Sequence, residues 1–232
     1  MFYLSDYEAQ ALLLSLKVAG YAMIWLIPLG VALAWLLAKK QFYGKSLLES
    51  VVHLPLVLPP VVIGYLLLVV MGRQGVIGSW LADTFNIVFS FSWQGAVLAC
   101  VVVALPLMVR SIKLSLESVD SKLEQAAATL GASPFKVFLT ITLPLMIPGI
   151  ITGSMLSFAR SLGEFGATIS FVSNIPGETQ TIPLAMYTFI ETPGSELEAA
   201  RLCVISIVIA LASLVFSEWL AKKSAKRLGA SA

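Results

Sequence analysis

Charged residues are scarce in this chain of 232 residues: Asp, Glu, Lys and Arg make up only 12% of it, whereas 58% is hydrophobic. An ordinary soluble domain is about 45–50% apolar and about 25% charged. Because so few polar side chains cannot cover a soluble globule, the composition predicts an all-α integral membrane protein and excludes disorder, a coiled coil and a disulfide scaffold. At about 20 apolar residues per crossing, the chain has room for roughly five or six transmembrane helices.

Residue types that bind metals or catalyse reactions are also few. The chain has one histidine, His53, and its two cysteines, Cys100 and Cys203, lie in apolar runs without Cys-x-x-Cys spacing. We therefore expect no metal site and no catalytic residue. The net charge of +2 does not indicate binding of nucleic acid. A Gly-Lys-Ser sequence at 44–46 lacks the first glycine of a phosphate-binding loop, whose place Lys39 takes, so we expect this chain to bind no ATP, Mg²⁺ or other cofactor.

Five apolar runs are long enough to cross a bilayer. They cover residues 11–38, 47–71, 93–112, 137–161 and 199–220. The second run contains Pro55, Pro59 and Pro60, which must kink or open the helix. The segment 162–198 holds two apolar pieces that are too short to span, and we expect it to be periplasmic or re-entrant. A crossing within this segment would raise the number of crossings to six.

The basic residues indicate an orientation, because cytoplasmic loops collect Lys and Arg. With five crossings and a periplasmic N-terminus, eleven of the 15 basic residues fall on the cytoplasmic side: Lys39, Lys40, Lys45, Arg110, Lys113, Lys122, Lys136, Lys222, Lys223, Lys226 and Arg227. The other four are Lys17, Arg73, Arg160 and Arg201. A sixth crossing would move the cluster 222–227 outside. The charges therefore favour five crossings and a cytoplasmic C-terminus.

The longest expected cytoplasmic loop contains an alanine-rich helix at about 121–131. Ser121 and Glu124 have the spacing of a capping box, with Asp120 as a competing N-cap, and Gly131 is suited to end the helix. Such a helix of small residues fits either of two roles. It could enter a groove of another protein, or it could be a connector that lies on the lipid headgroups.

This loop resembles the EAA loop of ABC-importer permeases, which reads Glu-Ala-Ala-x-x-x-Gly and is followed by Ile-x-Leu-Pro. The matching residues are Glu124, Gln125, Ala126, Ala127, Gly131, Leu143 and Pro144. The resemblance implies that this segment is the coupling helix, which docks on the ATPase subunit. Counted back from Gly131, the place of the motif's glutamate is held by Gln125, and Glu124 precedes it. Either residue could therefore make the polar contact with the ATPase.

Three further stretches are similar to the permeases of bacterial molybdate importers, namely residues 53–60, 160–168 and 173–179. Sulfate and thiosulfate permeases share some of these features. The resemblance runs from Leu14 to Cys203 and implies the polytopic helical bundle of a type I ABC-importer permease, with 1–232 as a single transmembrane domain in the bacterial inner membrane. It implies two ABC ATPase subunits that carry ATP and Mg²⁺, a periplasmic molybdate-binding protein, a second copy of this chain and the lipid bilayer as partners.

An oxyanion that passes a bilayer needs a cation or fixed dipoles along its path. The expected pathway and gate residues lie at the end of the fourth crossing, and they are Arg160, Ser161, Gly163, Glu164, Gly166 and Thr168. Arg160 could attract the anion, or it could pair with Glu164 four residues later. An ion-coupled secondary transporter is the alternative from another class. The crossings hold almost no ionisable residue at mid-membrane depth, which argues against that alternative.

Overall fold

The computed structural model describes residues 4–227, without the side chains of Ser121, Ser217, 221–222 and 224–227. Every regular element in this part of the chain is a helix. In chain order the elements are α1 (Asp6–Lys39), α2 (Lys45–His53), the 3₁₀ turn η1 (Leu54–Leu56), α3 (Pro60–Met71), α4 (Val76–Phe85), α5 (Trp93–Glu117), α6 (Ser121–Thr129), α7 (Pro134–Val137), the π-helical turn η2 (Phe138–Thr142), α8 (Leu143–Leu162), α9 (Gly166–Val172), α10 (Ile182–Glu191) and α11 (Glu196–Arg227).

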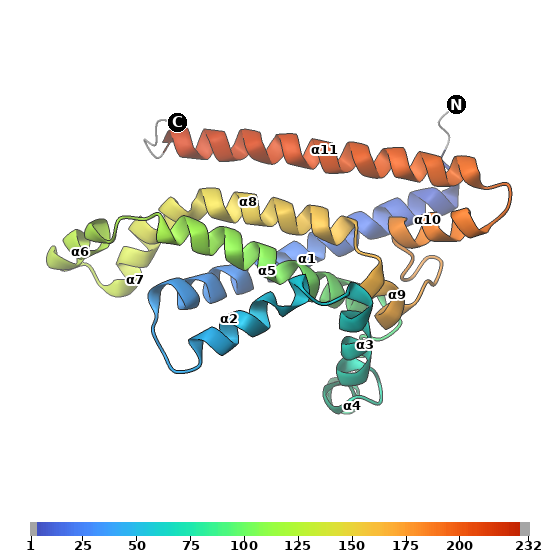
Figure 1. Ribbon diagram of the computed structural model, residues 1–232, viewed down its shortest axis with the longest axis horizontal. Helices are drawn as coiled ribbons and strands as arrows, with labels where there is room; N and C mark the ends of the chain where they lie inside the picture. Colours follow the sequence, from blue (N-terminus) through green and yellow to red (C-terminus); the bar gives the residue numbers. More distant parts are fainter. Residues whose placement is uncertain (1–3, 228–232) are drawn as a thin grey trace.

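Four long helices, α1, α5, α8 and α11, run along the long axis of the molecule (Figure 1). Each has the length and composition of a membrane span. The helix α5 is the most buried of them and packs between α1 and α8. Small residues allow this close packing, because a Cβ on Gly149 of α8 would lie 2.4 Å from the Cβ of Ser115 on α5.

The helix α11 packs loosely against α8 and α10 and leaves most of its surface exposed. Polar contacts hold its first turns to the start of α1. The Nε of Arg201 lies 2.9 Å from Oε1 of Glu8, a side chain that is fully buried, and the Nη2 of Arg201 lies 3.0 Å from Glu198. The remainder of α11 therefore presents an apolar surface that suits a lipid environment.

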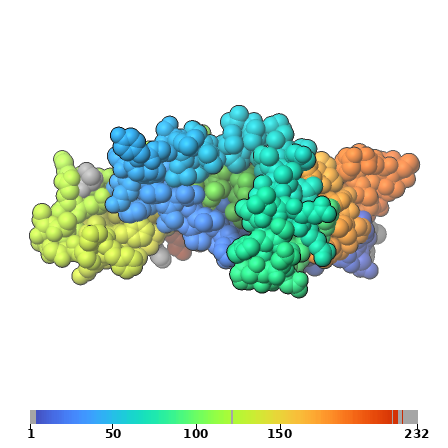
Figure 2. Space-filling view, turned by 90° about the horizontal axis from the view of Figure 1, so that it is seen from below, coloured from blue at the N-terminus to red at the C-terminus, as the bar shows by residue number. Residues whose placement is uncertain are grey.

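The second predicted crossing is broken, as its prolines led us to expect. The segments Lys45–Leu56 and Pro60–Met71 meet at an angle of 115°. Pro60 is the first residue of α3, where a missing N–H costs nothing. If this bent pair counts as one span, residues 4–227 hold up to five segments that are long and apolar enough to cross a membrane. The helix α3 and the following α4, an element that the sequence analysis did not contain, project from the side of the bundle and cover the middle of one face (Figures 1 and 2).

Between α8 and α11 the chain forms two short helices, α9 and α10. The ten residues of α10 would span only about half of a bilayer core. Its first N–H, that of Ile182, donates to Oγ of Ser15 on α1 at 2.7 Å. The start of α1 and the end of α11 lie at opposite ends of the long axis (Figure 1).

We predict that Gly64→Ala lowers the free energy of unfolding by about 2 kcal/mol, because the added Cβ overpacks the contact between α3 and α9. That Cβ would lie 2.5 Å from the carbonyl oxygen of Ala167 and 2.8 Å from the Cβ of Ser170. Gly20→Ala is the matched control, since nothing lies within 4 Å of a Cβ at this position of α1. Thermal unfolding of the purified protein in detergent measures the difference. Equal midpoints for the two variants would contradict the prediction.

Candidate functional site

The helix α6, which the EAA-like residues form, begins differently from the prediction. Its N-cap is Asp120, whose carboxylate accepts the N–H of Lys122 at 2.9 Å. The predicted capping box is wrong, because Glu124 is turned away from the start of the helix and bonds two other elements. The side chain of Ser121 lies outside the described part. The alternative that the sequence offered, Asp120, is the residue that starts this helix.

The end of α6 is as predicted. Gly131 has a φ of +83°, a conformation that glycine adopts without steric cost. Its N–H donates to the carbonyl of Ala128 at 3.0 Å, and the N–H of Ala132 donates to the carbonyl of Ala127 at 3.1 Å. These two bonds define a Schellman motif, which fixes a sharp turn after the helix.

The outer surface of α6 and α7 is unusually apolar for a loop. Gln125 and Ala126 are exposed, and around them Leu123, Leu130 and Phe135 are 49%, 88% and 71% exposed. These helices lie at one extreme end of the molecule, beyond the ends of α5 and α8 (Figure 1). An exposed apolar patch on a projecting tip is typical of a surface that a partner covers.

The inner side of α6 carries one polar contact site, the carboxylate of Glu124. The Nζ of Lys39, the last residue of α1, lies 2.7 Å from Oε2, and the Oγ1 of Thr142 donates to Oε1 at 2.6 Å. Burial raises the pKa of Glu124, but the hydrogen bonds from Lys39 and Thr142, together with the positive charge of Lys39, lower it by more, so the net pKa is below its ordinary value. The contact is therefore complete above the ordinary carboxyl pKa and is lost as the pH falls through the lowered value.

Thr142 belongs to the π-helical turn η2, which leads into α8. Pro144 explains this wider turn, because a proline has no N–H and its ring would clash with the carbonyl four residues earlier, that of Thr140. Leu143, the first residue of α8, packs against the hydrophobic core. The Ile-x-Leu-Pro element thus fixes both the π turn and the start of the helix, and π turns occur frequently at functional sites.

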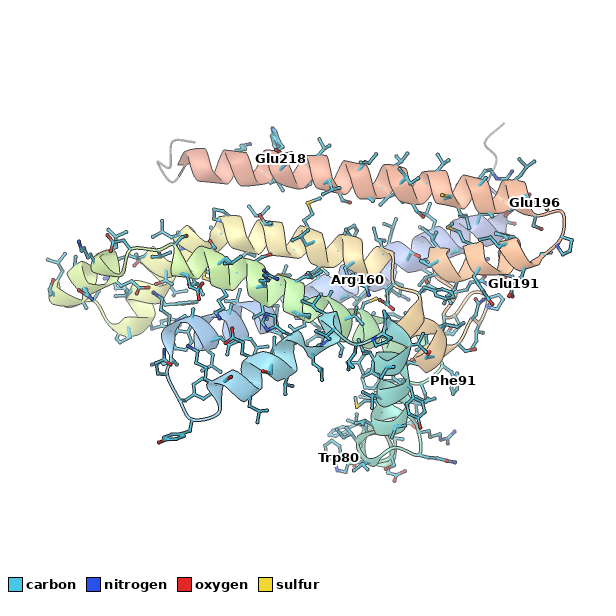
Figure 3. All side chains as sticks on the ribbon, in the orientation of Figure 1. Trp80, Phe91, Arg160, Glu191, Glu196 and Glu218 are labelled. Atoms are coloured by element: carbon cyan, nitrogen blue, oxygen red, sulfur yellow. The ribbon has the colours of Figure 1, made fainter. Side chains whose placement is uncertain are left out.

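At its other end, α8 holds Arg160 and Ser161, and the other predicted pathway residues follow in the break after α8 and in α9. Arg160 lies in the last turn of α8, inside the bundle and well away from Glu191 and Glu196 at the end of the molecule (Figure 3). Its Nη1 lies 2.6 Å from Oε2 of Glu164, which is only 1% exposed. This contact is an ion pair that lacks the alignment of a hydrogen bond.

The break between α8 and α9 leaves backbone groups that side chains satisfy. Oε1 of Glu164 accepts the N–H of Ala167 at 2.7 Å. The hydroxyl of Thr168 lies within hydrogen-bond distance of the carbonyl of Glu164, at 3.3 Å, and of the carbonyl of Phe165, at 2.9 Å, which also accepts the N–H of Ile169. The Oγ of Ser161 is buried and has no hydrogen-bond partner among the described residues. Ser161 Oγ is therefore the hydroxyl at this break that is available for another ligand.

The two broken helices cross each other at this point. A Cβ on Gly166 would lie 2.8 Å from the Cβ of Pro60, and one on Gly64 would meet the backbone of α9. Gly163 has more room, since the nearest atom to its would-be Cβ is the Ala159 carbonyl at 3.7 Å. The structure thus places Gly166 at a tight packing contact between α9 and α3.

The predicted residues form two separate groups at the two ends of α8. The sequence analysis missed Lys39 and Thr142 as partners of Glu124, since they are 85 and 18 residues away. It also missed the approach of α3 to α9. For the approach of α3 to α9, the local signal in the sequence was the cluster of prolines before α3, which indicated a break in that helix.

The family model for "Binding-protein-dependent transport system inner membrane component" matches residues 27–228. The chain is 66% identical to the molybdenum transport system permease protein ModB of Escherichia coli K12, over 97% of this chain and 99% of the relative. It is 64% identical to the protein of the same name from Haemophilus influenzae, over 96% and 97% of the two chains. A probable sulfate transport system permease protein of Nephroselmis olivacea is 35% identical over 86% of this chain and 70% of its own.

Among solved structures, the fold is similar to a chain of a bacterial ABC transporter involved in the import of the acidic polysaccharide alginate. The TM-score is 0.75 at 17% identity, and the match covers 95% of this chain and 80% of the other. At this identity the likeness concerns the fold alone, and it confirms the predicted helical bundle.

We predict that Glu164→Ala lowers the free energy of unfolding by about 3 kcal/mol, because it leaves Arg160 unpaired next to a buried site and removes the acceptor for Ala167. Glu164→Gln keeps an acceptor oxygen and is expected to cost less. The control is Glu178→Ala on an exposed turn, which should change stability by no more than about 0.5 kcal/mol. Thermal unfolding in detergent measures all three, and a Glu164→Ala variant as stable as the control would disprove the assignment.

Proposed function

The chain belongs to the family of binding-protein-dependent transport system inner membrane components, and we propose that it is the permease subunit of an ATP-driven importer that carries molybdate into bacteria. The observation that carries this proposal is its identity of 66% to a molybdenum permease along almost the whole chain. A sulfate permease is a much more distant relative, at 35%. Tungstate, a tetrahedral dianion like molybdate, would follow the same path.

The subunit has no enzymatic role in this proposal, and ATP is hydrolysed by a separate ATPase. The apolar tip of α6 and α7 provides the docking surface, with the exposed Gln125 and Ala126 at its centre. Two ATPase subunits, with their ATP and Mg²⁺, would each bind one such tip. The small side chains of α6 support this role, since they allow a close approach to a groove.

We place the tip of α6 in the cytoplasm and the start of α1 in the periplasm. The loop between α1 and α2 lies at the same end of the molecule as α6 and α7 (Figure 1). This end holds the lysines at positions 39, 40, 45, 122 and 136, which agrees with the positive-inside rule. At the other end Glu178, Glu191 and Glu196 are exposed and acidic, and this is the surface we assign to the periplasmic binding protein (Figure 3).

The pore itself would form between two copies of the chain. The projecting helices α3 and α4 expose large apolar side chains such as Tyr65, Val69 and Trp80. A pathway between two copies would pass the crossing of the broken helices, where Arg160 and the unpaired Oγ of Ser161 could meet the oxyanion. Closure of the ATPase dimer would then move the coupling helices and open this crossing to the periplasm.

The decisive experiment reconstitutes the chain with its ATPase in proteoliposomes and adds binding protein loaded with molybdate or with sulfate. We expect ATPase stimulation and uptake with the molybdate-loaded form alone. Stimulation by both forms would indicate a broader oxyanion permease. If no ATPase copurifies with the chain, the proposal is wrong and an ion-coupled secondary transporter becomes the better hypothesis.

We predict that Arg160→Ala reduces molybdate uptake by at least about tenfold. The reason is that the pathway loses a cation that stabilises the passing anion by about 1.4 kcal/mol or more. Arg160→Lys keeps the charge and should retain most of the activity. Arg73→Ala, on the exposed turn between α3 and α4, is the matched control. Uptake is compared at equal amounts of assembled complex, and wild-type uptake by Arg160→Ala would remove this residue from the path.

A further inference from the structure

Three elements that are far apart in the sequence meet at one carboxylate. Glu124 projects from α6, Lys39 ends α1, and Thr142 lies in the π turn before α8. The distances of 2.7 and 2.6 Å are short, as is usual for hydrogen bonds to charged groups. Thr142 is 2% exposed, and the side chains of Lys39 and Glu124 are about three-quarters buried. This contact is therefore shielded from water by the protein.

The helix α6 has little else to hold it. None of its described residues is buried, and it packs weakly against α7 and the π turn η2. Gln125, one position further along the helix, is exposed and has no side-chain hydrogen bond within the described part. Glu124 and Gln125, the two residues that the motif offered for the polar contact with the ATPase, thus have different surroundings.

Resting on the proposed function, we infer that Glu124 is a positioning residue that ties the coupling helix to α1 and α8, whereas Gln125 faces the ATPase. A displacement of α6 is passed by this carboxylate to two membrane-spanning helices at once. The helix α8 runs from Thr142 to the turn of Arg160, and α1 runs to its contact with α10. Long helices then join the proposed ATPase-docking surface at α6 to the proposed anion pathway near Arg160.

The π turn is the element that suits this role. Its hydrogen bonds are wider than those of an α-helix, and Pro144 removes one donor beyond it. The turn can therefore adjust while Thr142 stays bonded to Glu124. A stiff α-helical entry into α8 would lack this freedom.

The test compares Glu124→Gln, Thr142→Val and Gln125→Ala in the permease–ATPase complex. We expect Glu124→Gln to copurify with the ATPase as the wild type does, yet to transport about tenfold less molybdate for each ATP hydrolysed. Amide hydrogens of residues 121–131 should exchange about tenfold faster in the same variant. Thr142→Val, a milder change, should give a smaller effect in the same direction. Gln125→Ala should instead weaken ATPase copurification and leave exchange in the free permease unchanged.

The charge-swapped pair Lys39→Glu with Glu124→Lys gives a further check, because it should recover part of the exchange protection that Glu124→Gln loses. Exchange in Glu124→Gln as slow as in the wild type would overturn the inference. So would loss of ATPase copurification in Glu124→Gln but not in Gln125→Ala. If the wild-type complex imports no molybdate, the proposed function fails, while the exchange and copurification measurements still judge the role of Glu124.

Discussion

The structure depends on one constraint: a helix that breaks inside an apolar bundle must satisfy its freed backbone groups without water. In the described part of the chain, helices break at Pro60 and at Gly163, and these two breaks lie where α3 meets α9. The first break costs little because a proline at the start of α3 has no N–H to satisfy. At the second break the carboxylate of Glu164 accepts the N–H of Ala167, and the hydroxyl of Thr168 donates to the carbonyl of Glu164. Glycines at the contact then let the backbones approach closely.

The same constraint explains where charge occurs. Glu8 and Glu164 are the buried carboxylates of the described part, and each faces an arginine that is partly exposed. A buried carboxylate without such a partner would be strongly destabilising. Glu124 and Lys39 repeat the pattern outside the spans, where α6 meets the bundle. The chain thus uses several of its few charges to join separate helices.

Much of the architecture was predictable from the sequence because it follows from local chemistry. The apolar runs correspond to the long helices, prolines mark the broken span, and Gly131 ends the coupling helix through a conformation that favours glycine. The capping box failed for a physical reason: Glu124 gains more from a lysine and a threonine on other helices than from its own helix start. The helix α4 was missed, since its ten residues carry a short apolar stretch between glycines that reads equally well as a loop.

The sequence by itself determined that this protein is an integral membrane protein, which of its segments can cross a bilayer and which loop resembles a coupling helix. Composition and periodicity decide these properties, and they act over a few turns of helix. Only the tertiary structure decided which side chains meet. Lys39 and Glu124 are 85 residues apart, and their contact depends on how helices pack in three dimensions. The crossing of α3 with α9 depends on packing in the same way. Packing of this kind is set by shape and by the need to pair buried charges, and neither is visible along the chain.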